Sequence, residues 1–285
     1  MARALERRGT EWVVGGVAWE RFPVDPHPGP RPLTQVEGPT ALGSGAALVD
    51  PGRGATTPEG AHFCESRLAG FLEAQTVLID VTGGPAGAGT GVAEAATRLG
   101  CGLVVLVDIG GDAIAVGDEP GLASPLCDAV MIAGAAAECR EAGLDCVLGV
   151  LGAGCDGELR PAEVLARVAA LAGAGAWIET VGVTPEAADE IEAAAAVAVT
   201  EASLLVAKCA RGMHGQVEIR GGRRTVQAGP VAALCFLFDL EAALTELPLA
   251  RAVAGTASIT GARDALAAIG ISTELDYELR RAARG

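Results

Sequence analysis

Three segments of the chain repeat one pattern: an apolar run of strand length, a loop rich in glycine and acidic residues, and a stretch with helical character. They begin near Thr76, Gly102 and Asp145. Continuous apolar runs are typical of strands covered on both faces, and strand alternating with helix predicts parallel β-α-β units. Because parallel crossovers are right-handed, we expect the three loops at one edge of a common sheet. The pattern predicts an α/β fold with three layers and a mostly parallel, Rossmann-like sheet.

The rest of the chain adds helices, a rigid loop and a hairpin. We expect a helix at 2–8, a strand at 12–17, a proline-rich extended loop at 21–31, an Ala-rich helix from 184 to about 203, and short helices at 262–269 and 274–282. Gly221-Gly222 between strands 216–220 and 223–227 indicates a two-residue hairpin turn. No linker composition separates these parts. We therefore expect a single domain over 1–285, with a parallel part at 1–212 and the hairpin and final helices at 213–285.

Charge and composition exclude some classes of partner. The chain has 285 residues, a formal charge of −15 and a pI near 4.6, so nucleic acid and anionic membranes would be repelled. No segment approaches the roughly 20 apolar residues of a membrane-spanning helix. The eight cysteines form no Cys-x-x-Cys pair, which favours a reducing, cytoplasmic location. The sequence leaves open whether the protein forms a homo-oligomer.

The loop after the second apolar run carries four carboxylates: Asp108, Asp112, Asp118 and Glu119. Ser124-Pro125 then indicates a helix start. Carboxylates that lie close together raise one another's pKa unless a positive group sits among them. A divalent cation such as Mg²⁺, held by Asp108 and Asp112, or an amine of a ligand would supply that charge. The alternative is a solvated loop whose acidic side chains point into water.

The loop after the third run, Gly152-Ala-Gly-Cys-Asp-Gly-Glu158, is the second candidate. Asp156 and Glu158 add two carboxylates, and Gly154, like Gly110 and Gly111 of the first loop, allows a ligand close to the backbone. Cys155 has no histidine near it in sequence, so we expect a buried thiol rather than a nucleophile. The loop could also be a simple turn.

The hairpin contributes the positive groups. With Gly221-Gly222 as the turn, Arg220 lies opposite Arg223, and Glu218 lies opposite Thr225. Two guanidiniums that face each other repel, and a bound carboxylate or phosphate would turn this repulsion into affinity. The alternative is that both arginines extend into solvent or pair with acidic residues of the protein. His27, His62 and His214 lie far apart in sequence and do not indicate a transition-metal site.

Taken together, the chain resembles a prokaryotic family, archaeal in its best-known members, that is known only as a domain of unknown function. The resemblance rests on segments spread over nearly the whole chain: Trp19-Glu-Arg21, Asp25-Pro-His-Pro-Gly-Pro-Arg31, Phe63-Cys-Glu-Ser-Arg67, Asp108-Ile-Gly-Gly-Asp112, Gly117 to Leu126, Gly154 to Leu159, Thr200 to Ser203, Ile219 to Thr225 and Thr273 to Glu278. Members of that family typically begin with a strand and a Gly-Gly-Gly-Gly-Asp loop, so the resemblance implies that this chain lacks the first unit. One short loop, Asp108 to Gly117, is also similar to a loop of D-glutamate cyclase-like proteins, which hydrolyse a lactam.

These observations predict an enzyme that acts on a small anionic metabolite at the C-terminal edge of the sheet, by metal-assisted or carboxylate acid–base chemistry. The expected catalytic residues are Asp108, Asp112, Glu119, Asp156 and Glu158, and the expected substrate-binding residues are Arg220, Arg223, Gly110, Gly111 and Gly154. Two alternatives are a D-glutamate cyclase-like lactam hydrolase and a non-catalytic ligand-binding or assembly subunit.

Overall fold

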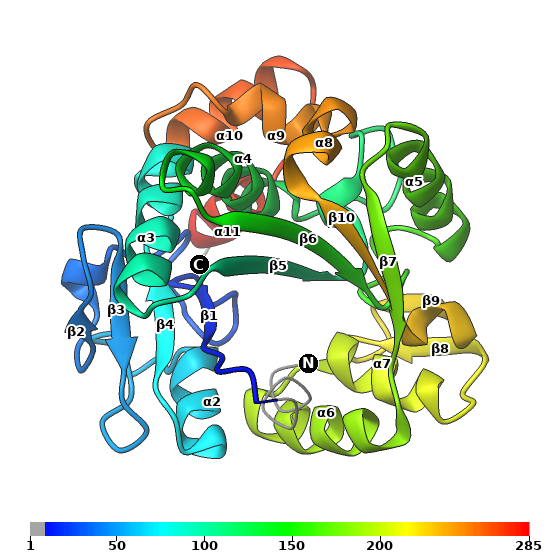
Figure 1. Cartoon of the computed structure of the whole chain (residues 1–285), viewed down its shortest axis with the longest axis horizontal. Coiled ribbons are helices and arrows are strands. Elements are labelled where there is room, and N and C mark those ends of the chain that lie inside the picture. The colour runs from blue at the N-terminus through cyan, green and yellow to red at the C-terminus, as the bar shows by residue number, and fades with distance from the viewer. Residues whose placement is uncertain (1–8, 285) are drawn as a thin grey trace. The chain divides into compact units, whose positions relative to one another are not determined.

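The computed structural model describes residues 9–284, which form two compact units (Figure 1). Of the described residues, unit 1 comprises 9–104, 130–145 and 252–284, and unit 2 comprises 105–129 and 146–251. Each unit therefore combines segments that are far apart in sequence. The helix expected at 2–8 lies outside the described residues, and the single-domain organisation stays a prediction.

Unit 1 is built on a four-stranded sheet with the order β1-β4-β3-β2. Its strands are β1 (Val14–Val17), β2 (Thr40–Ala41), β3 (Ala46–Val49) and β4 (Thr76–Ile79). β1 runs parallel to β4, whereas β3 pairs antiparallel with both β4 and β2. All four residues of β4 are buried, as its apolar sequence requires.

The helices of unit 1 pack on this sheet and on one another. They are α2 (Cys64–Leu72), α3 (Gly84–Arg98), α10 (Ile259–Ala268), α11 (Glu274–Ala282) and the C-terminal part of α4 (Pro125–Glu141), with the 3₁₀ helix η1 at Leu33–Gln35. α2, β3 and β4 contribute Ala69, Val49 and Leu78 to one buried cluster, which also includes Phe63, Ala18 and Ala55. α3 begins within the glycine-rich loop that follows β4, because Gly84 and Pro85 form its first turn.

Unit 2 contains the second four-stranded sheet, ordered β5-β6-β10-β7. Its strands are β5 (Leu103–Ile109), β6 (Asp145–Leu151), β7 (Trp177–Gly182) and β10 (Leu234–Asp239). β10 comes from the last third of the sequence, yet it lies between β6 and β7 and pairs antiparallel with both (Figure 1). The sheets of the protein thus mix parallel and antiparallel strands.

The other elements of unit 2 follow these strands. The helices are α5 (Pro161–Gly173), α6 (Pro185–Ala198), α7 (Glu201–Ala210), α8 (Leu240–Ala243) and α9 (Pro248–Val253), with 3₁₀ helices η2 (Asp112–Ile114), η3 (Pro230–Ala233) and η4 (Leu244–Glu246). The hairpin pairs β8 (Gly215–Ile219) with β9 (Arg224–Ala228). A buried cluster that includes Val206, Ile219 and Val226 packs α7 and the hairpin against Cys155. This cluster fixes the hairpin beside the loop that follows β6.

The α/β class and the antiparallel hairpin of the C-terminal third are confirmed, and two details differ from expectation. The strand at 76–79 belongs to the sheet of unit 1, so its loop does not share a sheet edge with the loops after β5 and β6. This strand pairs antiparallel with residues 46–49. The sequence of neither strand indicates the sheet to which the two belong. The Ala-rich helix is interrupted at Val199, which has a φ of +60° and ends α6 before α7 begins.

Among the helices described at 9–284, none combines the length and the apolar character needed to cross a bilayer.

Candidate functional site

The loops that follow β5 and β6 meet because the two strands are neighbours in the sheet. The Gly110 N–H donates a hydrogen bond to the Leu151 carbonyl over 3.0 Å, and the Gly154 N–H donates one to the Gly110 carbonyl over 2.7 Å. These backbone bonds tie the start of one loop to the start of the other. They bring the carboxylates of the first loop beside Asp156 and Glu158 of the second.

The glycines of these loops are needed for close packing. Gly110 has a φ of +133°, and a Cβ there would lie 2.3 Å from the Asp156 carboxyl carbon. Gly111 and Gly154 also have positive φ, and a Cβ on them would clash with Val164 and Pro161. The fold itself therefore explains all three glycines. Contact between these glycines and a substrate stays a prediction.

Five carboxylates gather where the loops meet. Asp108, Asp112 and Asp128 can each place one oxygen within 4.8 Å of the others, and so can Asp112, Asp156 and Glu158. Asp112 belongs to both groups of three, so the groups form one continuous acidic cluster. We define the acidic cluster by these five residues. Carboxylate oxygens are the donors that Mg²⁺, Ca²⁺ and Mn²⁺ prefer, and these acidic residues could hold a metal ion.

Asp128 is a member that sequence reasoning missed. It lies in the first turn of α4, directly after the first acidic loop. The available signal was its position four residues after Ser124, because a side chain in the first turn of a helix lies near the loop that leads into that helix.

Burial shifts the pKa values of the cluster upward. It raises the pKa of Asp108 to about 6, although hydrogen bonds from Asp112 and from the Gly111 N–H, 2.8 Å away, oppose this rise. Burial also raises the pKa of Asp156 to about 7, and the charge of Glu158 adds to the shift. For Asp112, burial and the charges of Asp128 and Asp108 hold the pKa well above its ordinary value. The cluster therefore holds protons near neutral pH unless a cation takes their place.

Asp156 has the most unusual surroundings in the cluster. Asp156 is only 6% exposed, and both of its carboxylate oxygens are buried without a well-formed hydrogen bond, although the nearby Glu158 N–H lowers the pKa of Asp156. A buried carboxylate without partners is destabilising by several kcal/mol, on the order of the penalty for any desolvated ion. A bound cation would remove this penalty.

Glu158 differs from the other carboxylates because its oxygens already have partners. They accept hydrogen bonds from the Ala123 N–H at 2.7 Å, the Ser124 N–H at 2.8 Å and the Ser124 hydroxyl at 2.7 Å. The same hydroxyl lies 3.2 Å from an oxygen of Asp112. Glu158 thus anchors the start of α4 to the second loop and helps to orient Asp112.

Glu119 lies apart from the acidic cluster. Its carboxylate accepts hydrogen bonds from the N–H groups of Val116 and Gly117, both over 2.8 Å, and so closes its own turn. Asp118 is exposed. Neither residue belongs to the two groups of three oxygens. The structure therefore brings together Asp108, Asp112, Asp156 and Glu158 of the expected set and leaves Glu119 outside.

The hairpin supplies positive charge beside the cluster, but partly from a residue that the sequence did not single out. The strand pairing has Glu218 opposite Thr225, as expected, and ends at Ile219 and Arg224. The Arg224 guanidinium approaches Glu158 at 3.8 Å, and its Nη1 atom is buried without a hydrogen-bond partner. The sequence did not single out Arg224, because nothing in its local pattern distinguishes it from an ordinary strand residue.

Arg220 and Arg223 lie in the turn, so the connection is longer than the expected two residues. Arg220 has a φ of +53°, and its backbone N–H bonds to the Glu201 carboxylate. The Arg223 guanidinium donates to the Arg220 carbonyl over 2.8 Å. Both arginines are exposed, and the charge of Arg220 lowers the pKa of Asp156. Anion binding by this pair stays a prediction.

Cys155 is unsuited to nucleophilic attack. It is 1% exposed, and burial raises the pKa of its thiol to about 12, so the thiolate is scarce at neutral pH. This agrees with the expectation of a buried thiol.

Comparison with known proteins supports the resemblance noted in the sequence. Neither the curated proteins nor the solved structures contain a match to the chain. The family model described as "Protein of unknown function (DUF1152)" matches residues 1–282, which is nearly the whole sequence. The chain therefore belongs to this family of proteins of unknown function.

Proposed function

We propose that the protein is an enzyme that acts on a small anionic metabolite and uses a divalent cation held by the acidic cluster. The observation that carries the proposal is Asp156, whose two carboxylate oxygens are buried and have no hydrogen-bond partner. Asp108 and Asp112 are the other expected cation ligands. Asp112 lies in both groups of three oxygens, once with Asp156 and Glu158 and once with Asp108 and Asp128, so either group would supply hard oxygen donors whose charge a cation would balance.

The neighbouring cations suit an anionic substrate. Arg224 lies at the edge of the cluster with one buried, unbonded nitrogen, and the exposed Arg220 and Arg223 lie in the adjoining turn. Guanidinium groups bind carboxylates and phosphates through paired hydrogen bonds. A bound cation would polarise a substrate oxygen or activate water, and the arginines would hold the remaining negative charge.

The same side chains are suited to proton transfer. Asp108 and Asp156 have pKa values of about 6 and about 7, so either can donate or accept a proton near neutral pH. These carboxylates would transfer protons either in a reaction that a bound cation assists or in one that needs no cation. The dependence on added cation distinguishes the two forms of the proposal.

Cation binding is tested by titration calorimetry with Mg²⁺ and Mn²⁺ above neutral pH. We expect Asp156→Asn and Asp112→Asn to weaken binding by about 10- to 100-fold or more, since loss of even an outer partner of a metal ligand has effects of that size. Asp118→Asn is the matched control, because Asp118 lies in the same loop but is exposed and outside the cluster. Failure of the wild-type protein to bind either cation, or equal weakening by the control, would contradict the metal-assisted form.

The substrate class is tested by thermal-shift screening with phosphates and amino-acid derivatives, with and without EDTA. Turnover of a stabilising ligand would establish an enzyme, whereas binding without turnover would favour a ligand-binding subunit. A separate arm with both isomers of 5-oxoproline tests the lactam hydrolase alternative, and we expect neither isomer to be opened.

A further inference from the structure

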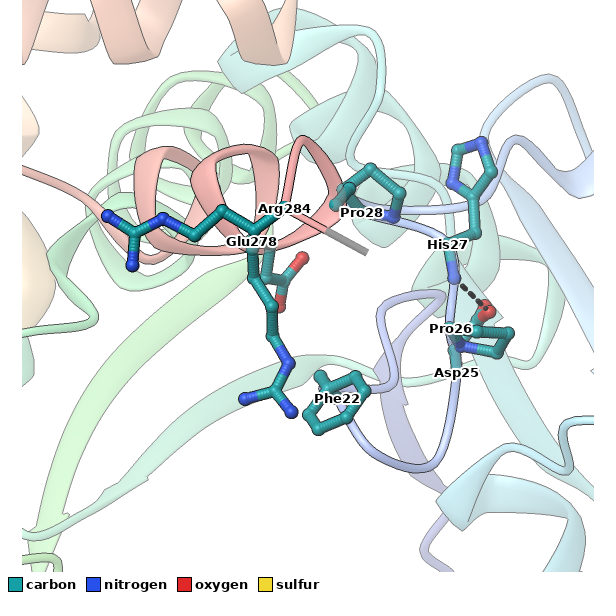
Figure 2. A pocket seen from close by; sticks show the side chains of 9 residues that line it. Phe22, Asp25, Pro26, His27, Pro28, Glu278 and Arg284 are labelled. Carbon is teal, nitrogen blue, oxygen red and sulfur yellow. Dashed lines mark hydrogen bonds between the residues drawn. The ribbon is translucent and has the colours of Figure 1, made fainter.

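A hollow lies in unit 1, between the proline-rich loop at 22–28 and helix α11. It has a volume of about 560 Å³, and Figure 2 shows Phe22, Asp25 and His27 on the loop side and Glu278 and Arg284 on the helix side. Pockets of about 300–1,000 Å³ are typical of small-molecule sites. The hollow shares no residue with the acidic cluster.

The acidic side chains of this hollow are already neutralised by the protein. Asp25 is 1% exposed, and two nitrogens of the buried Arg31 donate to its carboxylate oxygens, each over 2.8 Å. Burial opposes ionisation of Asp25, but the hydrogen bonds from Arg31 and from the His27 N–H hold its pKa below the ordinary value. Asp25 is therefore a paired carboxylate that would not repel an anion strongly.

Glu278 is held in a similar way. Its Oε2 atom accepts hydrogen bonds from the Trp19 indole over 3.1 Å and from the Gly29 N–H over 2.7 Å. The other oxygen lies 3.8 Å from the Arg21 guanidinium. These bonds join residues 19–29 to α11, although about 250 positions separate them in sequence. The walls of the hollow are therefore rigidly connected.

The positive side chains of the hollow are more available. The Arg281 guanidinium stacks 3.4 Å from the centre of the Phe22 ring and bonds to the Tyr277 hydroxyl over 3.3 Å. The Arg284 and His27 side chains make no hydrogen bond or ion pair with other residues in the described part of the chain. Arg281 and Arg284 are both exposed. The rim thus carries positive charge that no neighbouring acid neutralises fully.

We propose that this hollow binds a small molecule that carries a phosphate or carboxylate group on a flat, largely apolar body. Arg281 and Arg284 would bind the anion through their guanidinium groups, and His27 lines the loop side of the hollow. Phe22, Pro26 and Pro28 offer apolar surface for the body of the ligand. Nucleoside monophosphates and aromatic carboxylates have this combination of features.

The test is titration calorimetry with adenosine monophosphate, inorganic phosphate, adenosine and benzoate, all in EDTA so that the acidic cluster holds no cation. We expect adenosine monophosphate to bind more tightly than phosphate and uncharged adenosine not to bind. Benzoate tests whether a carboxylate group binds in place of the phosphate group. Added salt should weaken binding, because the guanidiniums are exposed and their charges are screened.

Two variants decide whether the hollow is the binding site. Arg284→Glu should weaken adenosine monophosphate at least tenfold, since it removes one cation and adds repulsion. Arg280→Glu makes the same charge change within α11, four residues before Arg284, but Arg280 does not line the hollow, so we expect little change. Absence of binding by both anionic organic probes, or equal loss in the two variants, would overturn the proposal. Asp156→Asn should leave this binding unaltered, which separates it from the proposed cation site.

Discussion

Asp156→Asn should make the cation-free protein more stable at alkaline pH. Burial raises the pKa of this carboxyl from 3.8 to about 7 in the folded protein. The unfolded chain therefore releases the proton first, and the folded state loses relative stability as the pH rises from about 4 to about 7. Each pKa unit corresponds to about 1.36 kcal/mol, so the full effect is about 4 kcal/mol.

The asparagine variant removes this pH-dependent loss, because its amide resembles the protonated carboxyl and carries no charge. We expect its free energy of unfolding to match that of the wild-type protein near pH 4. It should exceed the wild-type value by up to about 4 kcal/mol near pH 8. Urea unfolding in EDTA over this pH range measures the difference directly.

Added Mg²⁺ should reverse the order of the two proteins. The wild-type protein should gain stability through cation binding, whereas Asp156→Asn should gain much less. Asp118→Asn should differ from the wild-type protein by less than about 0.5 kcal/mol under both conditions, since it changes an exposed side chain. A variant that is less stable by the same amount at every pH would refute the reasoning. That result would mean that the Asp156 carboxylate has a partner in the fold.

Three further substitutions test the packing around the two sites. Gly110→Ala places a Cβ 2.3 Å from the Asp156 carboxyl carbon at a φ of +133°, so we expect a loss of about 2–4 kcal/mol in the free energy of urea unfolding. Glu158→Gln weakens the anchor of α4 and should cost about 1–3 kcal/mol, visible as faster exchange of the Ala123 and Ser124 amide hydrogens; unchanged exchange would exclude the anchoring role. Asp25→Asn breaks the buried ion pair with Arg31 and should lower the free energy of unfolding by about 3–5 kcal/mol, measured by thermal unfolding. Little change would contradict this and would mean that water reaches the pair.

Local sequence signals located the two acidic loops of the site. Each loop directly follows a long apolar run, and β5 and β6 are neighbours in one sheet, so Asp108, Asp112, Asp156 and Glu158 meet. The register of the hairpin was also readable, because Gly221-Gly222 between alternating strands places Glu218 opposite Thr225. Its turn was not, since the strand pairing ends at Ile219 and Arg224 and leaves Arg220 and Arg223 in the connection.

The remaining features depend on contacts between distant parts of the chain. Thr76–Ile79 has the same local pattern as β5 but belongs to another sheet, because its partners are β1 and β3. Arg224 reads as an ordinary strand residue until the hairpin packs beside the loop after β6. The break at Val199 has no glycine or proline to mark it. A single sequence does not specify such pairings, since many partners satisfy the same pattern.

The position of β10 has a consequence for the order in which the protein is synthesised and folds. β6 and β7 leave the ribosome well before residues 234–239, and each pairs with β10 along an edge. Until β10 emerges, both strands present open backbone donors and acceptors that can pair with another chain. Nascent chains that stop before residue 234 should therefore need chaperones, and translation pauses within this interval should increase aggregation.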